Sequence, residues 1–167
     1  MGSIAGTGAD IAIAIEGGDW PDEPTLDALV KAAARAVEEH LGEDFSGREL
    51  SLLFTDDAEI GSLNADWRGK PKPTNVLSFP AAAMPGMDDP PLGDIAFGYE
   101  TVRREAEEAD LTLADHITHL FVHGLLHLLG YDHEVITEAE AMERLEIAVL
   151  ARLGIADPYA GSEPEPH

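Results

Sequence analysis

Cysteine is absent from the 167 residues of this chain. Its absence excludes disulfides, thiolate metal ligands and a cysteine nucleophile, and it makes a reducing cytoplasm the expected compartment. Long apolar runs are missing too: no stretch of about 18 apolar residues occurs, so we expect no membrane span. The opening segment MGSIAGTGAD lacks the basic region followed by an apolar one that is typical of a secretory signal.

Basic residues are scarce, since 10 Lys and Arg face 33 Asp and Glu, which gives a formal net charge of -23. The mean field of such a protein repels a polyanion, which taken alone argues against nucleic acid as a partner. The charge is uneven, however. The segment RGKPKPTNVLSFP, residues 68–80, holds Arg68, Lys70 and Lys72 and no acidic residue. Charge alone favours a solvated loop as the explanation of this cluster.

The spacing of apolar residues predicts the secondary structure. Strands are predicted at residues 10–16, 49–55, 75–80 and 92–99. Helices are predicted from Pro24 to Gly42, from a capping box at Asp56 and Glu59 to Trp67, from the N-cap Thr112 to Leu129, and from a capping box at Thr137 and Glu140 to Arg152. Gly130 is expected to end the third helix in a left-handed conformation.

These elements predict a single compact domain over residues 10–154. The helices are not strictly interleaved with the strands, so we expect an α+β (mixed α/β) fold in which helices pack on about four strands. Residues 1–9 are predicted to be a flexible N-terminus, and residues 155–167, which end in GSEPEPH, a disordered tail.

Five of the seven histidines lie between positions 116 and 133. Four of them share one face of the long predicted helix, because steps of three and four residues stay on one side of a helix. One such residue is usually a core histidine with its hydrogen bonds satisfied. Four in a row, with a fifth just beyond the helix end, instead predict a metal site. The four on the helix are His116, His119, His123 and His127.

The spacing H-G-L-L-H-L-L-G-Y-D-H favours three of these histidines as ligands. His123 and His127 are one turn apart, and Gly130 lets the chain reverse so that His133 can return as the third ligand. Three imidazoles suit zinc, and three protein ligands plus water are typical of a catalytic site. We therefore predict one Zn²⁺ per chain on the helix and the following turn, with nickel, cobalt or iron as alternatives.

His119 is a rival ligand, one turn before His123. Ligands at 119, 123 and 127 would spread over about 12 Å of straight helix, which is too long for one ion. We therefore expect His119 to support a ligand or to pack nearby, and we assign no role to His116, His40 or His167. Asp94 and Asp132 have two open interpretations, a turn or cap or a partner of a ligand histidine.

The histidine spacing also matches the long zinc-protease motif H-E-x-x-H-x-x-G-x-x-H, with one decisive difference at position 124. In those proteases a Glu at this position takes the proton from zinc-bound water, whereas this chain has Gly124. The metal geometry is therefore retained while the protease mechanism is not supported.

Three segments together resemble the YbeY family of bacterial rRNA-maturation endoribonucleases. HGLLHLLGYDH at 123–133 is similar to the family's signature, NADWRGKPKPTNVLSFP at 64–80 to its second motif, and LGDIAF at 92–97 to its third. The three-histidine motif combined with TNVLSFP is specific, and the resemblance covers most of residues 10–153.

The resemblance implies a metal-dependent, single-strand-selective endoribonuclease that acts in small-subunit rRNA processing and ribosome quality control. It implies His123, His127 and His133 as metal ligands. It also implies Arg68 as a catalytically important residue in a cleft beside the metal. Position 75 is Asn here, where Asp also occurs in relatives.

The chemistry of the basic segment agrees with a phosphate substrate. A guanidinium such as that of Arg68 can hold a phosphate through two parallel hydrogen bonds and stabilise developing negative charge. Lys70 and Lys72 could hold flanking phosphates as point charges. The basic segment thus favours a phosphate substrate over a neutral one, and the resemblance implies that this substrate is single-stranded RNA, in particular rRNA.

Two other functions stay open. A metal hydrolase could act on a peptide or a small ester, although Gly124 argues against the peptide. A ribosome-assembly protein with a structural metal would suit the net charge of -23, because basic ribosomal proteins would be attracted to it. Ribosomal proteins or the small subunit are therefore expected partners. An open fourth coordination position would favour catalysis, since structural zinc is usually closed by four protein ligands.

Overall fold

The computed structural model describes residues 7–68, 74–81, 90–131 and 136–158, and only the backbone of residues 67, 68 and 136–139. Within these ranges the four predicted strands are confirmed, as are the four predicted helices and the single mixed α/β domain. The strands are β1 (Asp10–Ile15), β2 (Glu49–Thr55), β3 (Val76–Pro80) and β4 (Gly93–Gly98). The helices are α1 (Glu23–Leu41), α2 (Asp57–Arg68), α3 (Tyr99–Glu108), α4 (Leu113–Leu128) and α5 (Ile136–Arg152).

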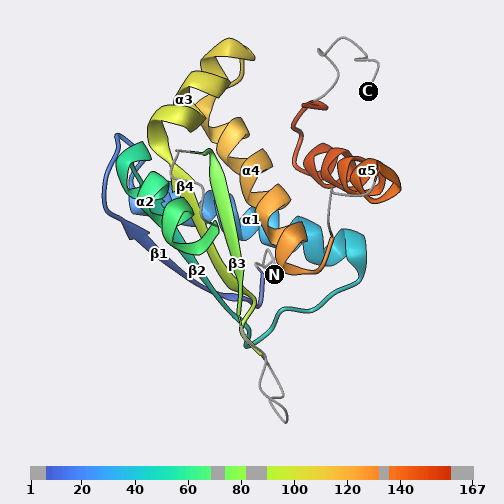
Figure 1. Cartoon of the computed structure of the whole chain (residues 1–167). Helices are drawn as coiled ribbons and strands as arrows, with labels where there is room; N and C mark the ends of the chain where they lie inside the picture. The colour runs from blue at the N-terminus through green and yellow to red at the C-terminus, as the bar shows by residue number, and fades with distance from the viewer. Residues whose placement is uncertain (1–6, 69–73, 82–89, 132–135, 159–167) are drawn as a thin grey trace.

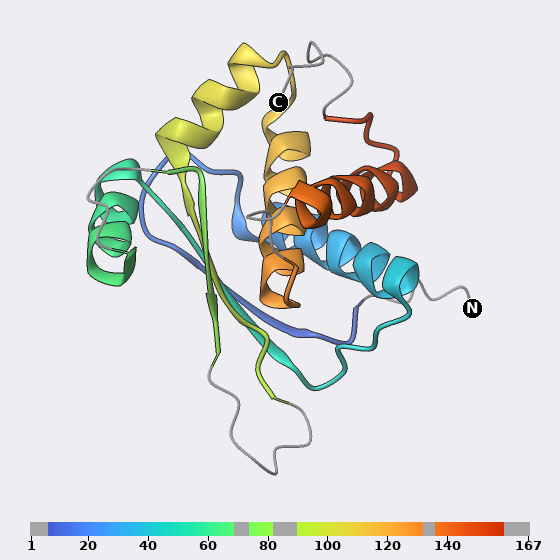
Figure 2. The ribbon, with the colours of Figure 1, turned by 45° about the vertical axis from the view of Figure 1, so that its right-hand side comes forward.

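The strands form one sheet in the order β1-β2-β4-β3. β1, β2 and β4 are parallel, and β3 joins the edge antiparallel to β4. Helices α1, α4 and α5 lie on one side of this sheet and α2 on the other (Figures 1 and 2). The edge strand β3 contacts α4, the helix that carries the predicted histidines.

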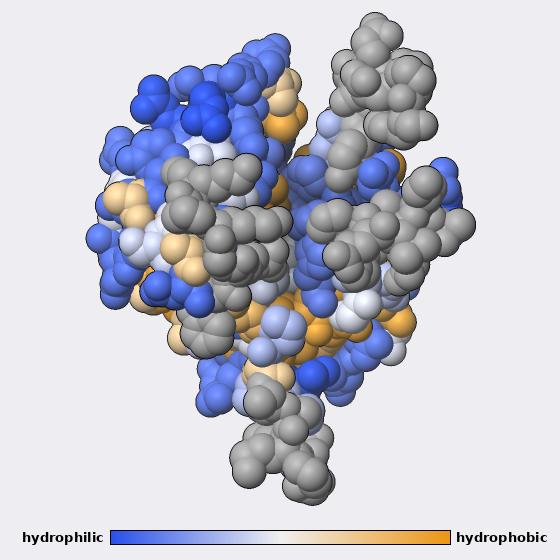
Figure 3. All heavy atoms as spheres, in the orientation of Figure 1, coloured by the Kyte–Doolittle hydropathy of each residue, from blue (hydrophilic) through white to orange (hydrophobic). Residues whose placement is uncertain are grey.

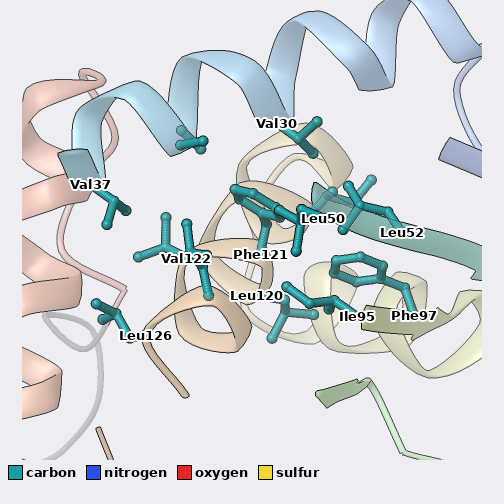
Figure 4. Packing of buried hydrophobic residues seen from close by; sticks show 14 of the residues in the cluster. Val30, Val37, Leu50, Leu52, Ile95, Phe97, Leu120, Phe121, Val122 and Leu126 are labelled. Carbon is teal, nitrogen blue, oxygen red and sulfur yellow. The ribbon is translucent and has the colours of Figure 1, made fainter. Parts of the chain in front are cut away.

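The main core lies between the sheet and helices α1, α4 and α5 (Figure 4). Alternation along the strands sends every second side chain of β2 and β4 towards these helices. The rings of Phe54 and Phe97 stack with their centroids 4.6 Å apart. Each fully buried side chain of this size contributes about 1.5–3 kcal/mol. Fully buried large residues of this core include Leu26, Leu50, Phe54, Ile95, Phe97, Ile117, Phe121, Leu125 and Leu126.

A helix that the sequence pattern did not predict, α3, comes directly after β4. Its N-cap is Gly98, which has no side chain to cap the first turn. Asp57 from the start of α2 supplies the cap instead: its Oδ1 accepts from the backbone N–H of Thr101 at 3.1 Å, and its Oδ2 from the Thr101 hydroxyl at 2.8 Å. The cap comes from 44 residues away in the chain, so no local spacing indicated it.

The ends of α4, which carries the histidines, agree with the predictions. The hydroxyl of Thr112 accepts from the backbone N–H of Asp115 at 3.1 Å, as an N-cap does. Gly130 comes just after the helix with a φ of +104°, in the region that favours glycine. These two residues fix where α4 begins and where the chain turns away from it.

The capping box predicted at Asp56 and Glu59 is only partly met. Asp56 accepts from the backbone N–H of Glu59 at 2.9 Å. The Glu59 carboxylate does not complete the box, because it accepts from the hydroxyl of Thr55 at 2.6 Å. α5 begins at Ile136, before the predicted capping residue Thr137.

Residues just outside the predicted boundaries of 10 and 154 also contact the core. Ala9, placed in the flexible N-terminus by prediction, is buried. Ile155 packs partly against the core and donates its N–H to the carbonyl of Leu150 at 2.9 Å. The predicted tail from residue 159 onward lies outside the described residues. Among the described helices, none has the length and apolar character needed to cross a membrane.

Candidate metal centre

One face of α4 brings His123 and His127 together. Their ring centroids are 4.7 Å apart and the rings meet edge to face at 76°. The opposite face of α4, with Phe121 and Leu125, is packed into the core, which holds the helix in place. The side chain of His123 keeps 27% of its surface exposed. The two predicted ligands on the helix are thus side by side and accessible.

A buried carboxylate on α5, Glu146, contacts this histidine face. Its Oε2 lies 2.7 Å from Nδ1 of His123, and its Oε1 lies 2.8 Å from Nε2 of His119. The Glu146 side chain is only 1% exposed. His119, predicted to support a ligand or to pack nearby, is therefore tied to a ligand candidate through a shared carboxylate.

The sequence prediction missed Glu146, although the sequence does contain a signal for it. Met142, Val149 and Leu150 are the buried residues of α5 around this position. Position 146 falls on the same helical face, because steps of three and four residues stay on one side of a helix. A glutamate in the core-facing register of an amphipathic helix is rarely buried unless a partner satisfies it.

The donor set fits a divalent metal ion. An ionised carboxylate at position 146 would only accept hydrogen bonds, so His123 would then donate through Nδ1 and would bind a metal through Nε2. Metal-binding histidines characteristically donate their other ring N–H to a carboxylate in this way. No group of three metal-ligating side chains occurs among the described residues. The predicted third ligand, His133, and its neighbour Asp132 lie outside them.

A second histidine–carboxylate contact lies nearer the N-terminal end of α4. Nε2 of His116 is 3.0 Å from Oε1 of Glu105 on α3, and the Asn75 side-chain N–H donates to the same oxygen at 3.0 Å. Burial by itself raises the pKa of Glu105. The hydrogen bonds to His116 and Asn75, with the charges of His116 and Arg104, outweigh burial and hold the pKa below its ordinary value. Asn75 thus links the start of β3 to the face of α4.

Gly124, at the position of the protease general base, faces the sheet. A Cβ built on it would lie 3.0 Å from Oγ of Ser78 on β3 and 3.2 Å from two methyl carbons of Ile95 on β4. Both distances are tighter than ordinary van der Waals contact. Glycine at this position therefore lets α4 pack closely on the sheet, and a longer side chain would have no space beside the histidines.

The basic segment is described only at its beginning. The backbone of Arg68 ends α2, while Lys70 and Lys72 lie outside the described residues. Asp94 is exposed on β4, and it is neighbour in sequence to Ile95, which points into the core on the helix side. Asp94 lies inside β4 and, because successive strand residues face opposite ways, it points away from α4. This position matches neither of the two roles considered for it, a turn or cap and a partner of a ligand histidine.

Asp94 instead lines a groove on the outer face of the sheet, with a volume of about 490 Å³. Leu53, Leu63, Phe79 and Ala96 also line it. The groove is therefore separate from the histidine face.

Seen from the side of Figure 1, the surface is hydrophilic over α3, and hydrophobic residues gather lower down around the end of α4 (Figure 3).

A family model and two similar proteins share one description, Endoribonuclease YbeY. A family model described as Endoribonuclease YbeY matches residues 15–154. The protein named Endoribonuclease YbeY from Sinorhizobium medicae (strain WSM419) is 48% identical over 169 residues, covering 95% of this chain and 99% of its own. The one from Rhizobium etli (strain CIAT 652) is 52% identical over 162 residues, covering 92% and 95%.

A solved structure also matches. The solution structure of TM1509 from Thermotoga maritima shares 25% sequence identity and a TM-score of 0.55. The match covers 94% of this chain and 99% of that one. The mixed α/β architecture is thus shared along nearly the whole length of both chains.

Proposed function

Because this chain belongs to the YbeY family of endoribonucleases, and is an RNA-cleaving hydrolase by that membership, we propose that it is a zinc-dependent endoribonuclease selective for single strands. Its proposed role is the processing of small-subunit rRNA and ribosome quality control. The observation that carries the metal dependence is the placement of His123 and His127 side by side, with His123 oriented by the buried carboxylate of Glu146.

His123, His127 and His133 would hold the ion. When bound, zinc acts as a Lewis acid on a phosphoryl oxygen and lowers the pKa of bound water to about 7. The chain contributes neutral imidazoles for binding, and Glu146 keeps the His123 ring in one orientation. Position 124 supplies no general base, because glycine has no side chain.

Arg68 is proposed to contact the scissile phosphate. Its planar guanidinium can form two parallel hydrogen bonds to one phosphate and stabilise the charge that develops during cleavage. Lys70 and Lys72 are proposed to hold flanking phosphates as point charges. The chain after α2 leads into the edge strand β3, on which α4 packs through Ser78 and Gly124. This connection supports a substrate path from the basic segment to the histidines.

The net charge of -23 supports a partner-assisted mode of action. The proposed compartment is the cytoplasm, as expected from the absence of cysteine. Repulsion between an acidic protein and a polyanion weakens unaided RNA binding, whereas basic ribosomal proteins would be attracted. We therefore propose that small-subunit proteins help to bring the enzyme to rRNA. A ribosome-assembly role with a purely structural metal is the second candidate, favoured by the same charge.

The test is cleavage of single-stranded rRNA by purified protein, with and without a chelator, and by His127→Ala. We expect cleavage by the zinc-loaded protein, none after chelation, and none by the variant. The matched control is His40→Ala, which removes an imidazole on α1 and should cleave like the unchanged protein. Cleavage that survives both chelation and His127→Ala would refute the metal dependence. Zinc binding without any cleavage, even with small subunits added, would favour the assembly role.

A further inference from the structure

We propose that Glu146 is a positioning residue of the metal centre, which holds His123 with its proton on Nδ1 and directs Nε2 towards the ion. The proposal rests on the metal site proposed above and adds a residue from a different helix. Glu146 lies on α5, whereas the ligand candidates described lie on α4. Its action is through His123, so it is not itself a catalytic residue.

Each oxygen of the Glu146 carboxylate contacts a different histidine. One oxygen lies 2.7 Å from Nδ1 of His123 and the other 2.8 Å from Nε2 of His119. His119 therefore serves as the second anchor and prevents the carboxylate from rotating. An imidazole that donates one ring N–H in a fixed direction presents its other nitrogen in a fixed direction too. The ring of His123 is thus set before any ion binds.

The negative charge of Glu146 also favours metal binding by His123. The carboxylate is almost fully buried, at 1% exposure, where its field is screened much less than at a surface. A hydrogen bond from imidazole to a carboxylate raises the basicity of the opposite ring nitrogen. Negative charge behind His123 therefore strengthens the attraction of Nε2 for a cation.

Glutamine at this position separates the proposed role from simple packing. Glu146→Gln keeps the size of the side chain but offers one carbonyl oxygen and one amide N–H₂ in place of two acceptors. Two imidazole donors can then no longer both be satisfied in their present tautomers. Glu143→Gln is the matched control, because Glu143 is exposed on the same helix and the substitution removes the same charge.

The first measurement is the zinc dissociation constant of the full chain, by competition with a chromogenic chelator. We expect Glu146→Gln to bind zinc about 10–100-fold more weakly, and Glu143→Gln to match the unchanged protein. One outcome would refute the role of Glu146 and support the metal site. In that outcome the unchanged protein and Glu146→Gln bind zinc equally well, whereas His127→Ala does not bind it. If the unchanged protein takes up no zinc, both the metal site and the role of Glu146 are refuted.

The second measurement needs no variant and so does not depend on how well Glu146→Gln folds. The ¹⁵N chemical shifts of the His123 ring report which nitrogen carries the proton. In the metal-free and the zinc-loaded protein we expect the proton on Nδ1. A ring with its proton on Nε2 in the metal-free protein would overturn the proposal.

Discussion

Ser78 on the edge strand β3 donates its hydroxyl to the backbone carbonyl of Gly124 on α4, at 3.2 Å. The helix that carries the histidines therefore lies directly on the strand that comes after the basic segment. The absence of a side chain at position 124 makes this approach possible, because a Cβ there would already press on Ser78 and Ile95. The difference from the zinc proteases at this position is thus built into the packing of the fold.

Restoring the protease glutamate should damage the protein and give no protease. Gly124→Glu forces a long charged side chain against β3 and β4. Overpacking together with burial of a charge is expected to cost about 3 kcal/mol or more. That loss corresponds to a fall in Tm of at least roughly 6–12 °C. Thermal unfolding followed by circular dichroism measures it, with Ala114→Glu, at an exposed position of α4, as the control. A stable variant with chelator-sensitive casein cleavage would contradict the packing argument.

Metal content should depend on the three predicted ligands. Alanine at His123, His127 or His133 removes one of three imidazoles, and a site that keeps only two protein ligands binds zinc much more weakly. His116→Ala removes a histidine of the same helix that contacts Glu105 instead. Elemental analysis after dialysis should give one zinc per chain for the His116 variant and little for the other three. Full zinc in His133→Ala would remove that residue from the ligand set.

Arg68 should affect cleavage without affecting the metal. Arg68→Lys keeps the charge but loses the planar pair of donors, and Arg68→Ala loses both. The loss of one transition-state contact typically lowers the rate about 10²–10³-fold. Single-turnover cleavage of single-stranded RNA measures it, with metal content checked on each sample. Lys70→Ala and Lys72→Ala should instead weaken binding and reduce the salt dependence by roughly one unit of log–log slope each. Full activity of metal-loaded Arg68→Ala would exclude the residue from the mechanism.

Glu105 should make stability depend on pH in the acid range. Its pKa in the folded chain lies below the ordinary value of 4.5, so the unfolded chain binds the proton more readily. Its contribution is therefore fully present above that value and is lost as pH falls through the lowered pKa. Urea unfolding between about pH 6 and pH 3 should show this loss, and Glu105→Gln should reduce it. Glu108→Gln, exposed on the same helix, is the control.

The Asn75 side chain gives a second test of the same contact. Asn75→Asp places a carboxylate where an amide now donates to Glu105. Like charges at this distance raise the pKa of one of the two groups. Raising the folded-state pKa of Glu105 removes the stability that its ionised form contributes, so we expect the variant to be less stable near neutral pH and to lose less stability on acidification than the unchanged protein. An unchanged pH profile would show that Asn75 does not hold the charge of Glu105.

Local spacing was enough to predict much of this protein. The step from His123 to His127 places both rings on one helix face whatever the rest of the chain does, because it depends only on helix geometry. The hydroxyl of Thr112 caps α4 from three residues away, and Gly130 ends it by its own backbone freedom. The four strands are predicted by apolar alternation over a few residues each. Such features depend on neighbours in the chain, so the sequence determines them directly.

The tertiary structure decided that Glu146 contacts His123 and that helix α3 follows β4. Glu146 reaches His123 across 23 residues, and Asp57 caps α3 through Thr101 across 44. Each contact exists only because the sheet order β1-β2-β4-β3 and the packing of α5 on α4 bring distant segments together. No periodicity in the chain encodes such a meeting, since it depends on the sum of many buried contacts and not on any one spacing.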